Sequence, residues 1–454
     1  MSSHIIDSEQ YGHLWGTETT RQLFGDRGRL RSWLQILSEL AQAQADCELI
    51  PRAAATTIAD VLAGLELDPA AVGQATREAG HSTLGLIRCL QAELPAHARE
   101  WIYYGATVQD LTDTWLGLVM QRMCGLLETG LSAVEAASVT LARRHRDTVM
   151  LARTHAQPGL PITFGFKAAV WVAELRRHQE RVAQAAPRLA VGQLCGAVGS
   201  GAFFGERAIE LQERFLARLG LRAPEIAWLT ARDRVTELAV LCALVTGTLG
   251  KIGNEIKQLQ RAEIGEVREP TREGLVGSIT MPHKRNPELS EHLGTLARVV
   301  RGGASLALEG STQEHERDGT AWKTEWAFVP EVCSATAVAL QLGADLLGGL
   351  GVDAARMRAN VDAQRGYVLS EPVMGAIAQT VGKHEAHRLV YEASITAIAD
   401  GRTFDEAIRS SEAGQHVTDD ELAQALDPER TAAHAASFVD RVLLGHSAGA
   451  AVVG

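Results

Sequence analysis

Residues 238–259 read Leu-Ala-Val-Leu-Cys-Ala-Leu-Val-Thr-Gly-Thr-Leu-Gly-Lys-Ile-Gly-Asn-Glu-Ile-Lys-Gln-Leu. Large aliphatic side chains recur in this stretch at spacings of three and four residues or sums of these. They are Leu238, Leu241, Val245, Ile252, Ile256 and Leu259. This period places them along one stripe of an α-helix, as in the seam of a helical bundle. The stretch therefore predicts one long, bundled helix.

The composition of the 454-residue chain agrees with this prediction. Hydrophobic residues make up 46% of the chain but aromatic residues only 5%, and Ala and Leu dominate. Such a composition favours long helices over sheets, and the length allows a large core. The formal net charge of -11 argues against nucleic acid or an acidic membrane as a partner, because phosphate groups bind basic patches.

The cysteines indicate a reducing compartment. Six of them lie scattered in apolar or helical contexts: Cys47, Cys89, Cys124, Cys195, Cys242 and Cys333. None forms a Cys-x-x-Cys pair or lies at metal-ligand spacing from a histidine. The first residues show no basic start before an apolar run, and no uninterrupted apolar run reaches membrane-spanning length. We therefore expect a cytoplasmic protein without a membrane partner, a metal or a cofactor.

Helical periodicity continues on both sides of the opening stretch. It predicts helices over residues 21–50, 53–65, 68–93, 115–147, 287–308, 327–349 and 384–399, and no alternating strand pattern. The glycines of residues 196–201 fit no phosphate-binding loop and indicate a helix break or a close backbone contact. We expect an all-α protein with an N-terminal helical domain (1–104), a central long-helix bundle (105–350) and a C-terminal helical domain (351–454).

The loop Gly277–Glu291 interrupts the helical pattern with Gly-Ser-Ile-Thr-Met-Pro-His-Lys-Arg-Asn-Pro-Glu-Leu-Ser-Glu. Gly277 lets the backbone turn, and the two prolines prevent a regular helix. Within nine residues the loop offers the hydroxyl of Ser278, the cation of Lys284 and the amide of Asn286. This set suits the removal of a proton next to a carboxylate and the stabilisation of the resulting negative charge.

The loop resembles the signature of the fumarase/aspartase superfamily, Gly-Ser-Ser-x-Met-Pro-x-Lys-x-Asn-Pro, with Ile279 in place of the second serine. Gly105–Asp110 resembles the Gly-x-Thr-Ser-x-Asp motif of that superfamily, with Val108 in place of the serine. Arg153–Pro158 is similar to Arg-Thr-His-x-Gln-Pro, and Gly382–Val390 resembles the C-terminal domain of the adenylosuccinate lyase and carboxymuconate cycloisomerase branch. The resemblance spans nearly the whole chain and implies a three-domain, all-α fold of the fumarase/aspartase type.

The resemblance also implies a role for each matching residue. Ser278 would be the general base that takes the β-proton, acting as an alkoxide stabilised by loop amides and cations. His155 would protonate the leaving group, and Glu291 matches the carboxylate that favours its charged form. Lys284 and Asn286 would stabilise the aci-carboxylate intermediate. The substrate-binding candidates are Thr107, Gln109, His81, Thr154, Gln157, Asn286 and Arg317.

Ordinary structural roles stay open for several of these residues. Thr107 suits the N-cap of the following helix, and His155 also suits a helix start. His81 fits a buried, satisfied histidine, and Glu291 fits a solvated helix face.

Two tryptophans argue against a nucleotide substrate. Where adenylosuccinate lyases hold the nucleotide phosphate with a serine and an arginine, this chain has Trp322 and Trp326, which cannot replace those groups. The pattern from Glu314 to Trp326 looks like that of 3-carboxy-cis,cis-muconate cycloisomerases. Those enzymes usually lack the histidines found here at His81 and His155, and both histidines favour elimination of a leaving group that needs a proton.

We therefore expect a lyase that performs anti β-elimination on a small 2-substituted succinate. It would cleave a carbon–nitrogen bond and release fumarate with an amine or nitrite. The alternative is a 3-carboxy-cis,cis-muconate cycloisomerase; an adenylosuccinate lyase or a non-catalytic structural homologue is a further alternative. Because the three loops come from different parts of the bundle, we expect a homotetramer whose active sites combine several subunits.

Overall fold

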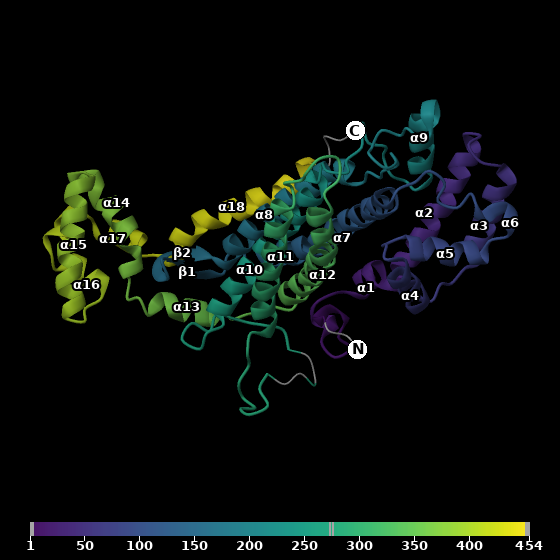
Figure 1. Cartoon of the computed structure of the whole chain (residues 1–454). Helices are drawn as coiled ribbons and strands as arrows, with labels where there is room; N and C mark the ends of the chain where they lie inside the picture. Colours follow the sequence, from purple (N-terminus) through teal and green to yellow (C-terminus); the bar gives the residue numbers. More distant parts are fainter. Residues whose placement is uncertain (1–3, 272–273, 275–276, 450–454) are drawn as a thin grey trace. The chain divides into compact units, whose positions relative to one another are not determined.

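The computed structural model describes residues 4–271, 274 and 277–449. In this part of the chain eighteen α-helices account for most residues, which confirms the all-α prediction (Figure 1). The five longest of the central region are α7 (Val108–Arg144), α8 (Phe164–Leu189), α10 (Asp233–Leu259), α11 (Glu288–Glu309) and α12 (Gly319–Gly348). By its internal packing the chain divides into two compact units, and each of these five helices contributes residues to both.

The stripe of α10 is buried as its spacing predicts. Its six aliphatic residues, Leu238, Leu241, Val245, Ile252, Ile256 and Leu259, are each no more than 4% exposed. Burial of each such side chain stabilises the fold by roughly 1.5–3 kcal/mol relative to exposure. By length and hydropathy α10 and α12 would also be able to cross a membrane, but 56% and 67% of their apolar windows are buried inside the protein, as in the core helices of a bundle.

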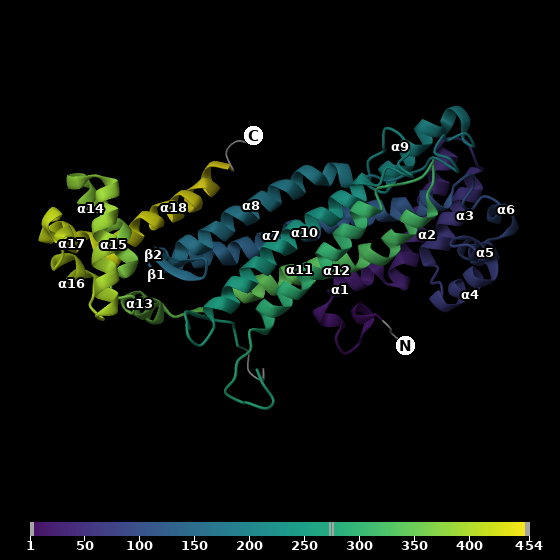
Figure 2. The same ribbon diagram turned by 60° about the vertical axis from the view of Figure 1, so that its left-hand side comes forward.

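The first unit comprises Met1–Leu131, His178–Leu249 and Thr295–Gln341. Besides its parts of the long helices, it holds α1 (Glu18–Phe24), α2 (Asp26–Asp46), α3 (Arg52–Gly64), α4 (Pro69–Ala79), α5 (Leu84–Glu93), α6 (Ala96–Arg99) and α9 (Ala208–Arg218), with 3-10 turns at Ile5–Asp7, Gly12–Leu14 and Gly205–Arg207. An aliphatic core buried under α2, α3, α5 and α9 holds these helices together. Figure 2 shows α2 to α6 gathered around that core.

Two helices predicted as continuous are broken in this unit. Residues 21–50 form α1 and α2, separated at Gly25, whose backbone is extended. The corner is tight, since a Cβ added to Gly28 would lie 1.6 Å from the carbonyl oxygen of Gln22. Residues 68–93 form α4 and α5, because Gly80 ends α4 in the left-handed region with φ 62°.

The second unit comprises Ser132–Arg177, Gly250–Gly294 and Leu342–Gly454. It holds α13 (Ala354–Asp362), α14 (Ser370–Val381), α15 (Lys383–Ala399), α16 (Phe404–Arg409), α17 (Asp419–Ala425) and α18 (Pro428–Gly449), with 3-10 turns at Tyr367–Leu369 and Glu412–His416. Helices α14 to α17 pack around a small apolar core of their own (Figures 1 and 2).

The second unit also contains strands, which the sequence did not predict. β1 (Val149–Thr154) pairs with β2 (Gln157–Thr163) in an antiparallel hairpin, and β3 (Val267–Arg268) pairs with β4 (Gly351–Val352). The hairpin carries a register shift between Leu151 and Arg153, and two prolines lie in β2. These features hide the usual alternation of a strand pair. The division into domains 1–104, 105–350 and 351–454 stays a prediction.

Candidate active site

Within the first unit, the N-termini of α7 and α12 meet through Thr107 and Arg317. Both terminal nitrogens of Arg317 donate to Thr107 Oγ1, at 3.2 and 3.1 Å, and one also donates to the carbonyl of Ala197 at 2.9 Å. Arg317 Nε is buried and has no hydrogen-bond partner among the described residues. A guanidinium beside two helix N-termini forms a site for an anion, because the helix ends also attract negative charge.

The backbone around Thr107 is held by the buried carboxylate of Asp110. It accepts hydrogen bonds from the amides of Thr107 at 2.8 Å, Cys195 at 2.8 Å and Gly196 at 3.1 Å. Burial raises the pKa of Asp110, although these amides oppose the shift. Gly196, at the start of the glycine-rich segment, is therefore held beside Thr107 through the Asp110 side chain. Helix α7 begins at Val108 rather than at the predicted residue 115, so Thr107 directly precedes the helix and its side chain faces Arg317.

A buried ion triad lies one turn further along α7. Arg232 donates to both oxygens of Asp113, at 2.9 and 3.0 Å, and to Glu325 on α12. Burial raises the pKa values of Asp113 and Glu325, and Arg232 opposes both shifts. Gln109 is fully buried beside this triad, and its amide donates to Asp113 and to the carbonyl of Leu229. In this conformation Gln109 therefore fixes the first turn of α7.

Residues of α2, α4, α7 and α12 line a cavity of about 310 Å³ in the first unit. Four tryptophans line it: Trp33, Trp115, Trp322 and Trp326. Trp322 and Trp326 pack edge to face with ring centroids 5.0 Å apart, and Arg29 lies over the ring of Trp115 at 5.0 Å. The two tryptophans that replace the phosphate-binding residues thus form one wall of an aromatic cavity.

His81 follows the left-handed Gly80 and lies at the start of α5. Its Nδ1 accepts from the amides of Thr83 and Leu84, at 3.4 and 3.3 Å. The ring is exposed rather than buried. His81 therefore caps α5 through one nitrogen, and Nε2 is the nitrogen that is left to contact a ligand.

In the second unit, His155 forms the tip of the β1–β2 hairpin. His155 and Ala156 are the two turn residues, with φ 53° and 62°, and both are exposed. These positive φ values are those of a tight hairpin turn. Thr154 and Gln157 pair directly beneath the turn and are also exposed. His155 therefore does not cap a helix, and it extends from a rigid support.

That support is anchored by Arg153. Its guanidinium forms two hydrogen bonds with the fully buried Glu266, at 2.9 and 2.7 Å. Asn360 on α13 donates to the same carboxylate at 2.8 Å. A bidentate pair of this kind fixes geometry as well as adding energy, so Arg153 positions the hairpin that carries His155.

The signature loop lies between α10 and α11, whose ends it joins (Figure 1). Ser278 Oγ accepts a hydrogen bond from the amide of Met281 at 3.1 Å, and Lys284 N–H donates to the Met281 carbonyl at 2.9 Å. Ile279 is 97% exposed. The close approach of the two sides of the loop requires glycine at position 277, because a Cβ there would lie 2.6 Å from the Lys284 carbonyl oxygen. The loop therefore has a defined shape and presents its polar groups outward.

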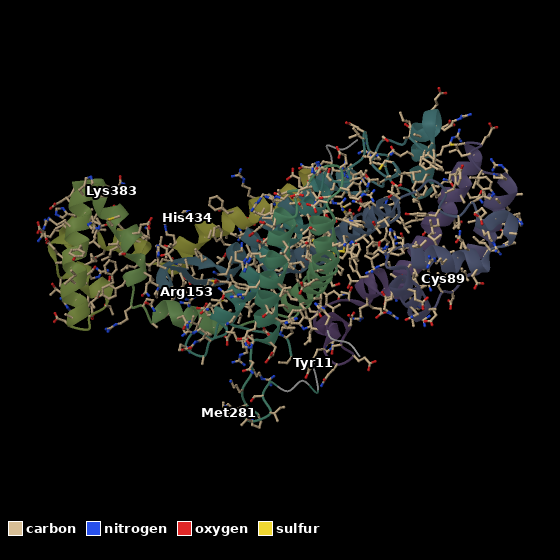
Figure 3. All side chains as sticks on the ribbon, in the orientation of Figure 1. Tyr11, Cys89, Arg153, Met281, Lys383 and His434 are labelled. Carbon is tan, nitrogen blue, oxygen red and sulfur yellow. The ribbon has the colours of Figure 1, made fainter. Side chains whose placement is uncertain are left out.

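Two further candidates lie where the loop meets α11. Asn286 donates to Glu288 at 3.3 Å. Glu291 lies in the first turn of α11 and forms an ion pair with Lys257 at 3.5 Å. Within one chain, the hairpin marked by Arg153 and the loop tip marked by Met281 lie apart (Figure 3).

The candidates thus form three groups: Thr107 with Arg317, the hairpin turn with His155, and the signature loop with Ser278, Lys284 and Asn286. Sequence reasoning missed the residues that position them, including Asp110, Asp113, Arg232, Glu325, Arg153 and Glu266. A signal was present at α7, where two acidic residues follow Thr107 in an apolar context. Cys195, which binds Asp110, and Arg232, which binds Asp113, lie 85 and 119 residues away in the chain, so no local pattern identified them.

Comparison with known proteins agrees with the motifs. A family model described as "Lyase" matches residues 13–302, and one described as "Adenylosuccinate lyase C-terminus" matches residues 366–442. The chain is 40% identical over 446 residues to the N-acetyl-S-(2-succino)cysteine lyase of Dickeya dadantii, covering 98% of each chain. It is 38% identical over 433 residues to the 3-carboxy-cis,cis-muconate cycloisomerase of Pseudomonas aeruginosa, covering 94% of each chain.

A solved structure is similar over the same length. The 3-carboxy-cis,cis-muconate lactonizing enzyme from Pseudomonas putida matches with a TM-score of 0.90 at 34% identity, covering 98% of this chain and 100% of that one. Sequence motifs, helical architecture and these relatives agree. The chain belongs to the fumarase/aspartase superfamily of lyases, in the branch of the adenylosuccinate lyases and carboxymuconate cycloisomerases.

Proposed function

We propose that the protein eliminates a thiol from a 2-thio-substituted succinate to give fumarate. The observation that carries this proposal is the arrangement of the signature loop. The Met281 amide donates to Ser278 Oγ in an exposed loop that also presents Lys284. An amide hydrogen bond favours the charged form of a hydroxyl, which a serine base needs.

In the proposed reaction, Ser278 takes the proton from C3 of the succinate. The electron pair moves into the C4 carboxylate to give an aci-carboxylate, which Lys284 and Asn286 stabilise. The pair then returns to form the C2–C3 double bond, while the C2–S bond breaks and the thiolate leaves. His155 supplies a proton to the sulfur. Arg317 and Thr107 bind a substrate carboxylate at the two helix N-termini.

The proposed leaving group is a thiolate, in place of the amine or nitrite that the sequence predicted. The relative with 40% identity is named as a lyase of a succinylated cysteine and covers 98% of both chains. A thiol has a pKa of about 8.5, so a thiolate needs less help from an acid than an amine does. An amine or nitrite stays the second leaving group to test.

A lactone-forming cycloisomerase is the second candidate function, favoured by the 38% identity to a 3-carboxy-cis,cis-muconate cycloisomerase. The same serine chemistry, run as an intramolecular addition, would give the lactone. The exposed His155 at the tip of its hairpin favours elimination, because lactone formation releases no group that needs a proton there.

We further propose a homotetramer with shared active sites and a cytoplasmic location. The separation of the Ser278 loop from the His155 hairpin within one chain supports sites built from several chains (Figure 3).

The direct test is a panel of substrates, followed by fumarate formation for the succinates and by loss of ultraviolet absorbance for the muconate. The panel contains S-(2-succinyl)cysteine, its N-acetyl derivative, an N-alkyl aspartate, nitrosuccinate and 3-carboxy-cis,cis-muconate. We expect fumarate from the thioethers, with stoichiometric release of thiol. Turnover of carboxymuconate alone would replace elimination by cycloisomerisation, and turnover of the aspartate or nitrosuccinate alone would restore a nitrogen leaving group.

A further inference from the structure

Three hydrogen-bond donors around the aromatic cavity of the first unit have no acceptor. They are Arg29 Nε, Trp33 Nε1 and Trp115 Nε1, and each is buried without a partner among the described residues. All three side chains line the same cavity. Because unpaired buried donors are costly, a cluster of three on one cavity points to a ligand that supplies an acceptor.

The carboxylates that line the cavity do not accept hydrogen bonds from these three donors. Asp113 and Glu325 also line it, but both are engaged by Arg232 at distances of 2.5 to 3.0 Å. The formal charges of Arg29, Arg232, Asp113 and Glu325 sum to zero. A neutral acceptor therefore enters at a lower desolvation cost than a carboxylate. A ligand ammonium would add donors where donors already lack partners.

We propose that this cavity is the leaving-group subsite and that it recognises an acyl carbonyl oxygen, as in an N-acylated amino thiol. The proposal rests on the thioether elimination described above. The three nitrogens are buried in this conformation. Entry of the ligand must therefore turn the two indoles and the guanidinium so that their N–H groups face the cavity. The aromatic walls formed by Trp322 and Trp326 would pack against the apolar part of the acyl group.

The position of the cavity fits this role. Thr112 and Trp115 contribute to it from α7, five and eight residues beyond Thr107, and Trp322 contributes from α12, five residues beyond Arg317. At 1.5 Å per helical residue, the cavity begins about 8 Å beyond the proposed carboxylate site. This spacing is about that between a succinate carboxylate and a substituent carried on its leaving group.

The test compares kcat/KM for three thioethers of 2-succinate: those of N-acetylcysteine, cysteine and 3-mercaptopropionate. The last carries neither an acyl group nor an ammonium. We expect N-acetylcysteine to be favoured over 3-mercaptopropionate by about tenfold or more. Trp33→Phe and Trp115→Phe, which remove the indole N–H together with part of the ring, should each lower this ratio by about threefold to tenfold.

Trp326→Phe is the matched control, because Trp326 lines the same cavity but its nitrogen is not among the unpaired buried donors. It should lower the ratio by less than Trp115→Phe does, because it removes ring contact with the acyl group but no unpaired buried donor. Equal turnover of the N-acetylcysteine and 3-mercaptopropionate thioethers would overturn the proposal. So would a Trp326→Phe variant that lowers the ratio as much as Trp115→Phe.

Calorimetry separates this proposal from the proposed reaction. N-acetyl-S-methylcysteine should bind more tightly than 3-(methylthio)propionate, and Trp115→Phe should remove the difference. If the acyl ligand binds more tightly in this way but no thioether is turned over, the subsite is supported and the proposed thioether elimination is rejected. Thioether turnover without preferential binding of the acyl ligand would reject the subsite and leave the reaction standing.

Discussion

Arg317 donates hydrogen bonds to Thr107 Oγ1 from both terminal nitrogens, at 3.2 and 3.1 Å, and so joins the N-termini of α7 and α12. The two residues lie 210 positions apart in the chain. Their contact places a guanidinium, a hydroxyl and two helix ends at one point of the first unit. A carboxylate that binds there would gain charge-assisted hydrogen bonds in addition to the helix dipoles.

Arg317→Lys should therefore weaken substrate binding. A lysine keeps the charge but loses the fork that reaches Thr107 and a ligand together. We expect kcat/KM to fall by about tenfold to a hundredfold, mainly through KM, as measured by initial rates of fumarate formation. Arg207→Lys, which alters an arginine paired with Glu210, serves as the control. An equal loss in both variants would remove Arg317 from the binding site.

Gly277→Ala should distort the signature loop without unfolding the protein. The added Cβ would lie 2.6 Å from the Lys284 carbonyl oxygen, so the two sides of the loop must move apart. A displacement of about 1 Å at a catalytic group costs on the order of a hundredfold in rate. We expect such a loss of kcat with an unchanged melting temperature. Gly302→Ala, where a Cβ meets nothing within 4 Å, should leave kcat unchanged; normal activity of Gly277→Ala would contradict the role given to the loop shape.

Arg232→Met should destabilise the first unit. The side chains of Arg232 and Asp113 are each 1% exposed and that of Glu325 is 7% exposed, so removal of the cation leaves two buried carboxylates without a counter-charge. The expected loss is about 3–5 kcal/mol in the free energy of unfolding, measured by denaturant titration. Arg188→Met, at an exposed pair with Glu237, should cost far less, because solvent screens that pair. If Arg232→Met lowered the free energy of unfolding as little as Arg188→Met, the triad would not stabilise the fold.

Two inactive variants should restore activity when their subunits mix. The hairpin marked by Arg153 and the loop tip marked by Met281 lie apart within one chain (Figure 3). A site shared between subunits, as proposed, would therefore take His155 and Ser278 from different chains. Ser278→Ala and His155→Gln should each be inactive alone, and partial activity should return after subunit exchange. Native mass spectrometry would verify the exchange and the tetramer. If subunits exchange but no activity returns, Ser278 and His155 of the same chain must act in the same site.

Much of the fold was predictable from the sequence because its information is local. The stripe on α10 predicted a buried helix, and α3, α11 and α15 begin and end close to the predicted positions. The break at Gly25 was not predictable, because it depends on the close approach of Gly28 to Gln22. The β1–β2 hairpin was missed because its prolines and register shift obscure a strand pattern.

The candidate site residues were likewise predictable only where they are close together in the sequence. Ser278, Lys284 and Asn286 are neighbours in sequence, so one motif identified them together. The contact of Thr107 with Arg317 and the pairing of Arg153 with Glu266 join distant segments. Only the packing of the helices brings such residues together. The cavity walls were partly foreseen, since Trp322 and Trp326 had already argued against a nucleotide.

Ser278 is proposed to remove a proton from a succinate and so to release fumarate and a thiol. The most direct measurement is the rate of fumarate formation from S-(2-succinyl)-N-acetylcysteine by the wild-type protein and by Ser278→Ala. We expect turnover by the wild type and a loss of about 10²–10⁴-fold or more in the variant, with an unchanged melting temperature because the loop is exposed. Near-normal fumarate formation by Ser278→Ala would contradict the account.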